Sequence, residues 1–139
     1  MKRVFLDTNI ILDLNLKRDP FYSDAIQIFS SSNRFNYFTS SLCIANAFYL
    51  VEKAYSNVQA KRDMEEICNH LRIIPVSEST VHLALQALFK QFRDFEDAIQ
   101  YYCSFSERME CIVTRNERDF HKAELPIYSP KKFLKLFAA

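Results

Sequence analysis

The sequence contains no glycine in 139 residues, although ordinary usage would give roughly ten. This absence excludes the glycine-rich phosphate-binding loops of nucleotide-binding proteins and the glycine-flanked nucleophile turn of α/β-hydrolases. It also disfavours an all-β fold rich in hairpins, because the tight hairpin turns need positive φ at both central residues. Any left-handed backbone positions are expected at asparagines instead. The candidates are Asn33, Asn57, Asn69 and Asn116.

A strong net charge is missing as well. Eighteen Lys and Arg residues oppose seventeen Asp and Glu residues, which leaves a formal charge of +1. Such a chain has no long-range field to attract a polyanion. If a nucleic acid binds, a local patch or a metal ion must attract it.

The four cysteines form no C-x-x-C pair and, together with the three histidines, show no zinc-ligand spacing. We interpret them as reduced, mostly buried thiols of a cytoplasmic protein. No signal-peptide pattern follows the basic N-terminus. The longest nearly apolar run, residues 42–51, is half the length of a membrane span, so no membrane association is expected.

Apolar residues make up 49% of the chain and charged residues 25%, a balance typical of a globular domain. No linker or repeat divides the sequence, so we expect a single domain over residues 1–139. Short apolar runs without alternation predict strands that are buried on both faces. These runs are residues 4–6, 37–39, 73–76 and 111–114, with 127–128 as a fifth candidate.

Between these runs, apolar residues recur at helical spacing. The segments are residues 21–29, 44–55, 81–89 and 95–109. Strands that alternate with helices predict an α/β fold, a three-layer α/β/α sandwich around a four- to five-stranded, mostly parallel sheet. In such a sheet a ligand binds beyond the carboxyl ends of the strands.

Acidic residues gather at the places where this fold would put a ligand. Asp7 follows the first strand, Asn116 and Asp119 follow the strand at 111–114, and residues 94–97 open the helix before that strand. Clustered carboxylates repel one another, and a hard cation such as Mg²⁺ or Mn²⁺ relieves the repulsion. Such an ion can activate water for phosphodiester hydrolysis without a His or Cys nucleophile.

Helix capping is the competing interpretation of each acidic cluster, because acids are common at helix starts for structural reasons. The three cap candidates are Asp7 or Thr8, Asp94 with Asp97, and Asn116 with Asp119. Capping accounts for each cluster by itself. It does not explain why all three fall on one edge of the predicted sheet.

Three segments resemble the motifs of PIN-domain proteins. In chain order they are residues 5–13 (FLDTNIILD), 94–98 (DFEDA) and 112–120 (IVTRNERDF), and the similarity extends to 129–134 (SPKKFL). The order and the separations also fit, so the resemblance runs essentially from end to end. It implies an α/β/α sandwich and a metal-dependent ribonuclease, often the toxin of a VapBC-type toxin–antitoxin pair. An RNA substrate, an antitoxin protein and a second copy of the chain are the implied partners.

Carried over by position, the resemblance implies that Mg²⁺ or Mn²⁺ is held by Asp7, Asp97 and either Asn116 or Asp119. Asp7 would be the central ligand, while Asp97 would bind the metal or orient the attacking water. The residues with implied supporting roles are Asn9, Asn46, Asp94, Glu96 and Thr114. The candidates for contact with RNA phosphates are Arg115, Arg118 and Lys122, which otherwise form a solvated charged surface.

One departure from the family pattern concerns the helix after the second strand, where an acid is usual and this chain has Asn46. Glu52 lies six residues further on and so faces another side of that helix. A neutral amide still ligates through oxygen, but one negative charge is lost. A weakly active or inactive PIN-like module that binds RNA or protein is therefore the alternative function. A haloacid dehalogenase-type phosphatase ranks lower, because Asn9 occupies the place of its second Asp.

Overall fold

The structure is a computed structural model that describes residues 2–120 and 123–138. Its centre is one sheet of five parallel strands in the order β3-β2-β1-β4-β5. The strands are β1 (Arg3–Leu6), β2 (Asn36–Ser40), β3 (Arg72–Ile74), β4 (Cys111–Val113) and β5 (Ile127–Tyr128). The predicted α/β class and parallel sheet are confirmed, and the fifth candidate strand is present.

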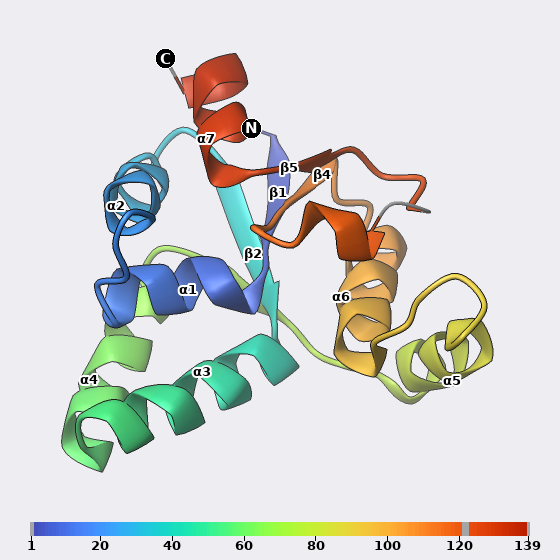
Figure 1. The fold of residues 1–139 in the computed structure, drawn as a ribbon, viewed down its shortest axis with the longest axis horizontal. Coiled ribbons are helices and arrows are strands. Elements are labelled where there is room, and N and C mark those ends of the chain that lie inside the picture. Colours follow the sequence, from blue (N-terminus) through green and yellow to red (C-terminus); the bar gives the residue numbers. More distant parts are fainter. Residues whose placement is uncertain (1, 121–122, 139) are drawn as a thin grey trace.

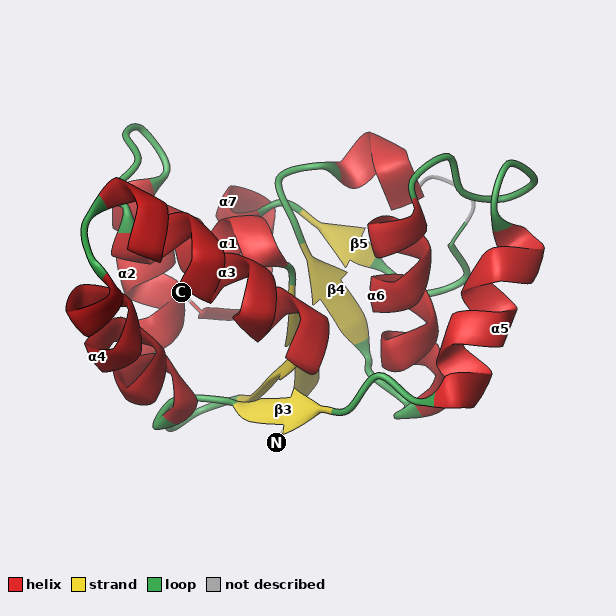
Figure 2. Cartoon of the chain, turned by 90° about the horizontal axis from the view of Figure 1, so that it is seen from below, coloured by secondary structure: helices red, strands yellow, loops and turns green. Residues whose placement is uncertain are grey.

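Helices cover both faces of this sheet. They are α1 (Thr8–Asn15), α2 (Tyr22–Ser30), α3 (Ser41–Ala54), α4 (Asn57–Cys68), α5 (Glu78–Ala87), α6 (Phe95–Ser106) and α7 (Pro130–Phe133). Helices α1 to α4 lie on one side, and α5 and α6 lie on the other (Figure 1, Figure 2). The predicted three-layer α/β/α sandwich is confirmed. None of the helices in the described part of the chain has the length and apolar character needed to cross a membrane.

Several predicted boundaries are wrong, and helix α4 was not predicted. The strand expected at residues 73–76 ends at Ile74, because Pro75 has no N–H to continue the ladder. The helix expected at 95–109 ends at Ser106. Helix α4 begins after Ser56, whose hydroxyl accepts a hydrogen bond from the Gln59 amide at 3.1 Å.

The strand order creates a switch point between β1 and β4. From β1 the chain moves outward to β2 and β3, and it later returns to pair β4 with the other edge of β1. Both strands are completely buried along most of their length, which anchors their carboxyl ends in the core. Ligands of open α/β sheets bind in the crevice at such a point. Asp7 and Thr114 are the residues that follow β1 and β4 there.

In this chain without glycine, the residues with left-handed backbone conformation are not the ones that the sequence predicted. Positive φ occurs at Lys17 (52°), Phe89 (67°) and Arg108 (56°), and at no asparagine among the described residues. The prediction that asparagines would supply these positions is wrong. Each of the three follows closely on the end of a helix, where a left-handed residue lets the next amides bond to the last carbonyls of the helix. After Lys17 the Arg18 amide donates to the Asp13 carbonyl at 3.1 Å, and after Arg108 the Met109 amide donates to the Ser104 carbonyl at 2.9 Å.

Candidate active site

Asp7 lies at the carboxyl end of β1 with both carboxylate oxygens hydrogen-bonded. The Thr114 hydroxyl donates to Oδ2 at 2.8 Å, and the Thr8 amide donates to Oδ1 at 2.8 Å. Asp7 is also the N-cap of α1, so the capping interpretation of this residue is confirmed. The role of Asp7 as a helix cap is compatible with a role in a binding site. The hydrogen bond that caps the helix also fixes the orientation of the carboxylate, which is only 5% exposed.

The Thr114 hydroxyl joins the end of β4 to the start of α1. While it donates to Asp7, it accepts from Asn9 Nδ2 at 3.2 Å and from the Asn116 amide at 3.0 Å. The other end of the Asn9 side chain accepts from the Arg115 amide at 3.3 Å. Asn9 and Thr114 therefore hold the turn after β4 against Asp7. Residues that support the Asp7 carboxylate would be expected to make such contacts.

The acids at the start of α6 divide into a cap and two side chains nearer the sheet. Asp94 Oδ1 accepts from the Asp97 amide at 3.0 Å, so Asp94 caps the helix as the alternative interpretation expected. Glu96 accepts a hydrogen bond from the Thr8 hydroxyl at 3.2 Å, which ties α6 to α1 across the sheet edge. Asp97 is half-buried beside them.

A cleft of about 410 Å³ brings the three acidic clusters together. Its lining residues are Asp7, Thr8, Asn9, Asp94, Glu96, Asp97, Asn116 and Asp119. Asn46 is not among them. It lines a neighbouring hollow of about 300 Å³, which shares Thr8 and Glu96 with the cleft.

Crowding in this cleft raises the pKa of Asp97 from 3.8 to about 8. Burial is the largest cause, and repulsion from four neighbouring carboxylates adds to it. These neighbours are Asp7, Asp94, Asp119 and Glu96. In the metal-free protein at neutral pH, the Asp97 carboxyl therefore favours its protonated, neutral form.

The pKa of Asp7 is raised from 3.8 to about 6. Burial is again the largest cause, and the hydrogen bonds from Thr114 and Thr8 offset part of it. Repulsion from Glu96 and Asp119 raises the value further. The protein thus places carboxylates where their charge is unfavourable, which is a pattern typical of functional sites.

The donor atoms of the cleft are carboxylate, amide and hydroxyl oxygens, which suit a hard cation such as Mg²⁺ or Mn²⁺. No three His, Cys, Asp or Glu side chains in residues 2–120 and 123–138 are grouped closely enough to hold a metal ion as they stand. Asp119 is exposed and Asp97 is half-buried, and both line the same cleft as the fixed carboxylate of Asp7.

Comparison with known proteins places the sequence in a family. Residues 3–118 match the PIN domain family, which is most of the chain. The chain belongs to the PIN-domain family. The three motifs on which the resemblance was based all begin inside the matched segment.

Relatives of this PIN domain align over almost its whole length. It is 28% identical over 136 residues to "Ribonuclease VapC1" from Aquifex aeolicus (strain VF5), which covers 95% of this chain and 93% of the relative. The VapBC-1 structure from nontypeable Haemophilus influenzae superposes with a TM-score of 0.72 at 18% identity, covering 94% of this chain and 99% of that one. A toxin–antitoxin complex from Klebsiella pneumoniae gives 0.68 at 21% identity, with 91% and 97% covered.

The predicted RNA-contact residues of this PIN domain have different surroundings. Arg115 forms a two-pronged ion pair with Asp13, with Nε–Oδ2 at 2.6 Å and a second nitrogen 3.0 Å from Oδ1. Its guanidinium also lies 3.8 Å from the centroid of the Phe21 ring. Arg115 thus has a structural role that was not predicted, and its contact with RNA stays a prediction. Arg118 is exposed near the cleft, and Lys122 lies outside the described residues.

Asp13 is the residue of this network that sequence reasoning missed. It lies in the motif at residues 5–13, but its side chain is only 1% exposed and faces the interior. The available signal was an acid three residues after Ile10 on the apolar side of α1. An acid in that place needs a buried partner, because an unpaired buried charge is strongly unfavourable.

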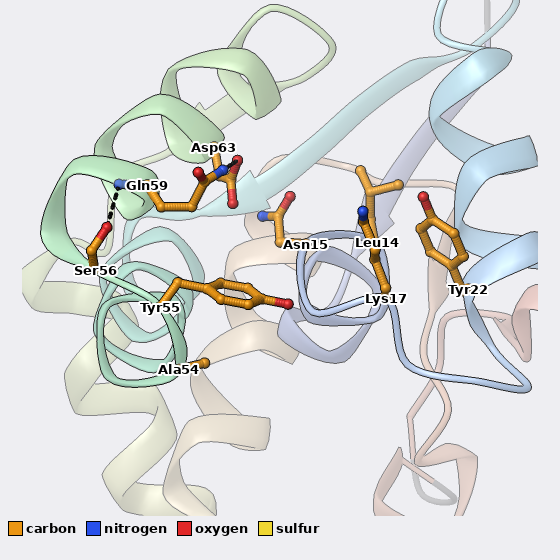
Figure 3. A pocket seen from close by; sticks show the side chains of 9 residues that line it. All are labelled: Leu14, Asn15, Lys17, Tyr22, Ala54, Tyr55, Ser56, Gln59 and Asp63. Atoms are coloured by element: carbon orange, nitrogen blue, oxygen red, sulfur yellow. Dashed lines mark hydrogen bonds between the residues drawn. The ribbon is translucent and has the colours of Figure 1, made fainter.

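An open hollow of about 750 Å³, larger than the acidic cleft, lies at the far end of α1 (Figure 3). It is lined by the end of α1, the start of α2, the first turns of α4 and the turn between α3 and α4, from which Tyr55 points toward α1. None of the predicted site residues lines it. Its carboxylate, Asp63, already accepts a hydrogen bond from Gln59 Nε2 at 2.8 Å. Cavity size alone therefore does not identify the active site.

The raised pKa values predict that the metal-free protein loses stability as the pH increases. Each folded-state pKa, about 6 for Asp7 and about 8 for Asp97, exceeds the unfolded value. The native state therefore binds these protons more tightly, and the stabilisation is complete below about pH 4 and lost as the pH rises through 6 and 8. We expect Asp97→Asn to remove a pH-dependent loss on the order of 1 kcal/mol, allowing for solvent screening at a half-buried carboxyl.

Urea unfolding in the presence of a chelator, repeated between about pH 5 and pH 8.5, measures this difference. The wild-type and Asp97→Asn curves should converge at low pH and separate at high pH, with the variant more stable. Parallel curves over the whole pH range would show that the charge of Asp97 is not unfavourable in the folded protein.

Proposed function

We propose that this PIN domain is a metal-dependent endoribonuclease that hydrolyses RNA phosphodiester bonds. The observation that carries the proposal is the convergence of Asp7, Asp97 and Asp119 in one cleft at the switch point of the sheet. The mutual repulsion that raises the pKa of the first two acids is the kind that a bound cation relieves. The relative named Ribonuclease VapC1 supports RNA as the substrate.

In this proposal Asp7 is the central metal ligand, joined by Asp97 and by either Asn116 or Asp119. A bound Mg²⁺ or Mn²⁺ would polarise the phosphoryl group and supply hydroxide from water near neutral pH. Thr114 fixes the orientation of the Asp7 carboxylate, because its hydroxyl donates a hydrogen bond to Asp7 Oδ2 at 2.8 Å. Asp94 fixes the first turn of α6, and thereby the backbone that carries Asp97.

We also propose that the ribonuclease is the toxin of a toxin–antitoxin pair. Similar folds in the Haemophilus and Klebsiella structures belong to proteins described as VapBC-1 and as a toxin–antitoxin complex. An antitoxin protein that restrains the enzyme, a homodimeric assembly and a cytoplasmic place of action belong to the same proposal. So does the treatment of residues 1–139 as one domain, which the single sheet running from β1 to β5 supports.

The experiment that tests the proposal is an RNA digestion with purified protein. Single-stranded and structured RNA should be cut in the presence of Mn²⁺ or Mg²⁺, and a chelator should stop the reaction until the metal is restored in excess. A gel of end-labelled RNA gives the rate and the cut positions. Cleavage that persists unchanged in the chelator would contradict the metal-dependent mechanism.

One observation favours a second candidate, a PIN module that binds RNA without cutting it. Asn46 supplies no charge at a place where the family usually has an acid, and it lies in the neighbouring hollow rather than in the cleft. Calorimetric titration with Mn²⁺ separates the two candidates, because a nuclease must bind the metal at millimolar concentration. The phosphatase alternative loses support, since the Asn9 amide is engaged with Thr114 and Arg115.

A further inference from the structure

A second hollow, of about 440 Å³, adjoins the acidic cleft on the side of α5 and α6. Its lining residues are Gln91, Arg93, Asp94, Asp97, Arg118 and Asp119. All three acids of the hollow, Asp94, Asp97 and Asp119, also line the cleft, so the two spaces lie side by side. A chain that occupies the cleft can therefore extend into the hollow.

The hollow differs from the cleft in its charge. Arg93 enters it from the loop between α5 and α6, directly before the cap residue Asp94. Arg118 enters from the short 3-10 turn after β4. Both side chains are exposed, and the two guanidinium groups come from segments 25 positions apart in the chain. Guanidinium groups match phosphate in both charge and hydrogen-bond geometry.

The hollow on the other side of the cleft has no comparable charge. Its lining residues are Thr8, Asn46, Tyr49, Leu50 and Glu96, none of which is a cation. The phosphate backbone of a nucleic acid that crosses the acidic cleft is repelled there unless cations lie close by. Of the two hollows beside the cleft, only the one on the α5–α6 side is lined by cations.

Arg93 is better suited than Arg115 to bind a phosphate of the substrate. The Arg115 guanidinium is paired with the Asp13 carboxylate within the protein. Within residues 2–120 and 123–138, the Arg93 guanidinium takes part in no ion pair or hydrogen bond. Its charge is available to a ligand in the hollow.

We propose that Arg93, together with Arg118 from the same hollow, binds the RNA phosphate next to the scissile one, and that the RNA leaves the cleft through this hollow. The inference rests on the proposed ribonuclease function and adds to it a direction for the substrate and a residue that the motifs did not indicate. Arg93 binds substrate in this role and takes no part in the chemical step.

Binding of a fluorescent single-stranded RNA to the Asp7→Asn protein, measured by anisotropy at several salt concentrations, tests the inference without cleavage. Adding Arg93→Ala should raise Kd about five- to tenfold near 0.1 M salt and flatten the slope of log Kd against log salt by about 0.7. Arg62→Ala is the matched control, because Arg62 is an exposed arginine on α4, which lies on the other side of the sheet (Figure 1). It should leave both quantities unchanged.

A neutral phosphate analogue then locates the contact. Once the cut position of the wild-type enzyme is mapped, RNAs that carry one methylphosphonate linkage are compared with unmodified RNA. At one linkage beside the cut, the substitution should abolish the difference between the proteins with and without Arg93. At linkages farther away that difference should persist.

The outcomes separate this inference from the function on which it rests. If wild-type protein cuts RNA with Mn²⁺ while Arg93→Ala leaves Kd and the salt slope unchanged, only the inference is overturned. Equal effects of Arg93→Ala and Arg62→Ala would also overturn it, since they would reflect overall charge. A gain in Mn²⁺ affinity with unchanged RNA affinity would assign Arg93 to balancing the acids. Failure of the wild-type protein both to bind and to cut RNA would overturn the function and the inference together.

Discussion

Asp7→Asn is expected to lower the rate of RNA cleavage by about three orders of magnitude or more, which corresponds to roughly 4 kcal/mol in the activation barrier. Asp7 is the carboxylate around which the other acids of the cleft are arranged, and it is the one whose direction is fixed by two hydrogen bonds. The amide is the same size as the carboxylate but carries no charge, so the proposed metal loses its central ligand. Initial rates on end-labelled RNA with Mn²⁺ measure the effect.

Loss of the fold is tested separately by urea unfolding of the metal-free variant. Burial raises the pKa of Asp7 to about 6, so removing the charge is stabilising at pH 7.5 and offsets the loss of the hydrogen bond that the Thr114 hydroxyl donates to the carboxylate. Asp24→Asn, in the first turn of α2 and outside the cleft, is the matched control and should keep full activity. An Asp7→Asn protein that retains wild-type rates in a preparation free of contaminating nuclease would refute the assignment of the site.

Arg115→Ala is expected to reduce the free energy of unfolding by about 3 kcal/mol. The substitution leaves the Asp13 carboxylate, which is 1% exposed, buried without its partner. It also removes the guanidinium that lies 3.8 Å from the Phe21 ring centroid, which adds a smaller loss. Urea unfolding at neutral pH measures the change, and a fall of the midpoint without a change in slope is the expected form.

A double variant distinguishes the ion pair from general packing. Asp13→Asn combined with Arg115→Ala should be less destabilised than the sum of the two single variants, because no unpaired buried charge remains. Strictly additive losses would contradict a direct interaction between the two side chains. Lys61→Ala is a suitable comparison, since its ion pair with Glu65 is exposed and should contribute less than about 1 kcal/mol.

The sequence was sufficient to predict the layers, the parallel sheet and the edge at which the acids meet. These features depend on local patterns, such as the short apolar runs that end at Asp7 and Thr114, and on general rules of chain topology. The sequence also predicted the helix-capping role of Asp94, because a cap residue and its partner amide are three residues apart. Local spacing carries this kind of information directly.

The features that escaped prediction have either a distant partner or a weak local signal. Arg115 was expected to face RNA, but its partner Asp13 is 102 positions away and becomes buried only in the folded chain. Helix α4 carries buried Ala60, Met64 and Ile67 at helical spacing, yet its mean hydropathy is low, because polar and charged residues fill most of its other positions. The left-handed residues lie just after the ends of helices α1, α5 and α6, and the sequence marks such positions clearly only when glycine occupies them.

The hydrogen bond between Thr114 and Asp7 spans 107 positions of the chain. Contacts of such long sequence separation close late in folding, because the entropy of the intervening loop must be lost first. During synthesis, a ribosome-bound chain that ends before β4 has Asp7 and Asp97 but neither Thr114 nor Asp119. The acidic cleft is therefore incomplete until more than four-fifths of the sequence has been translated, so a growing polypeptide lacks the proposed catalytic centre while it is still beside the RNA that encodes it.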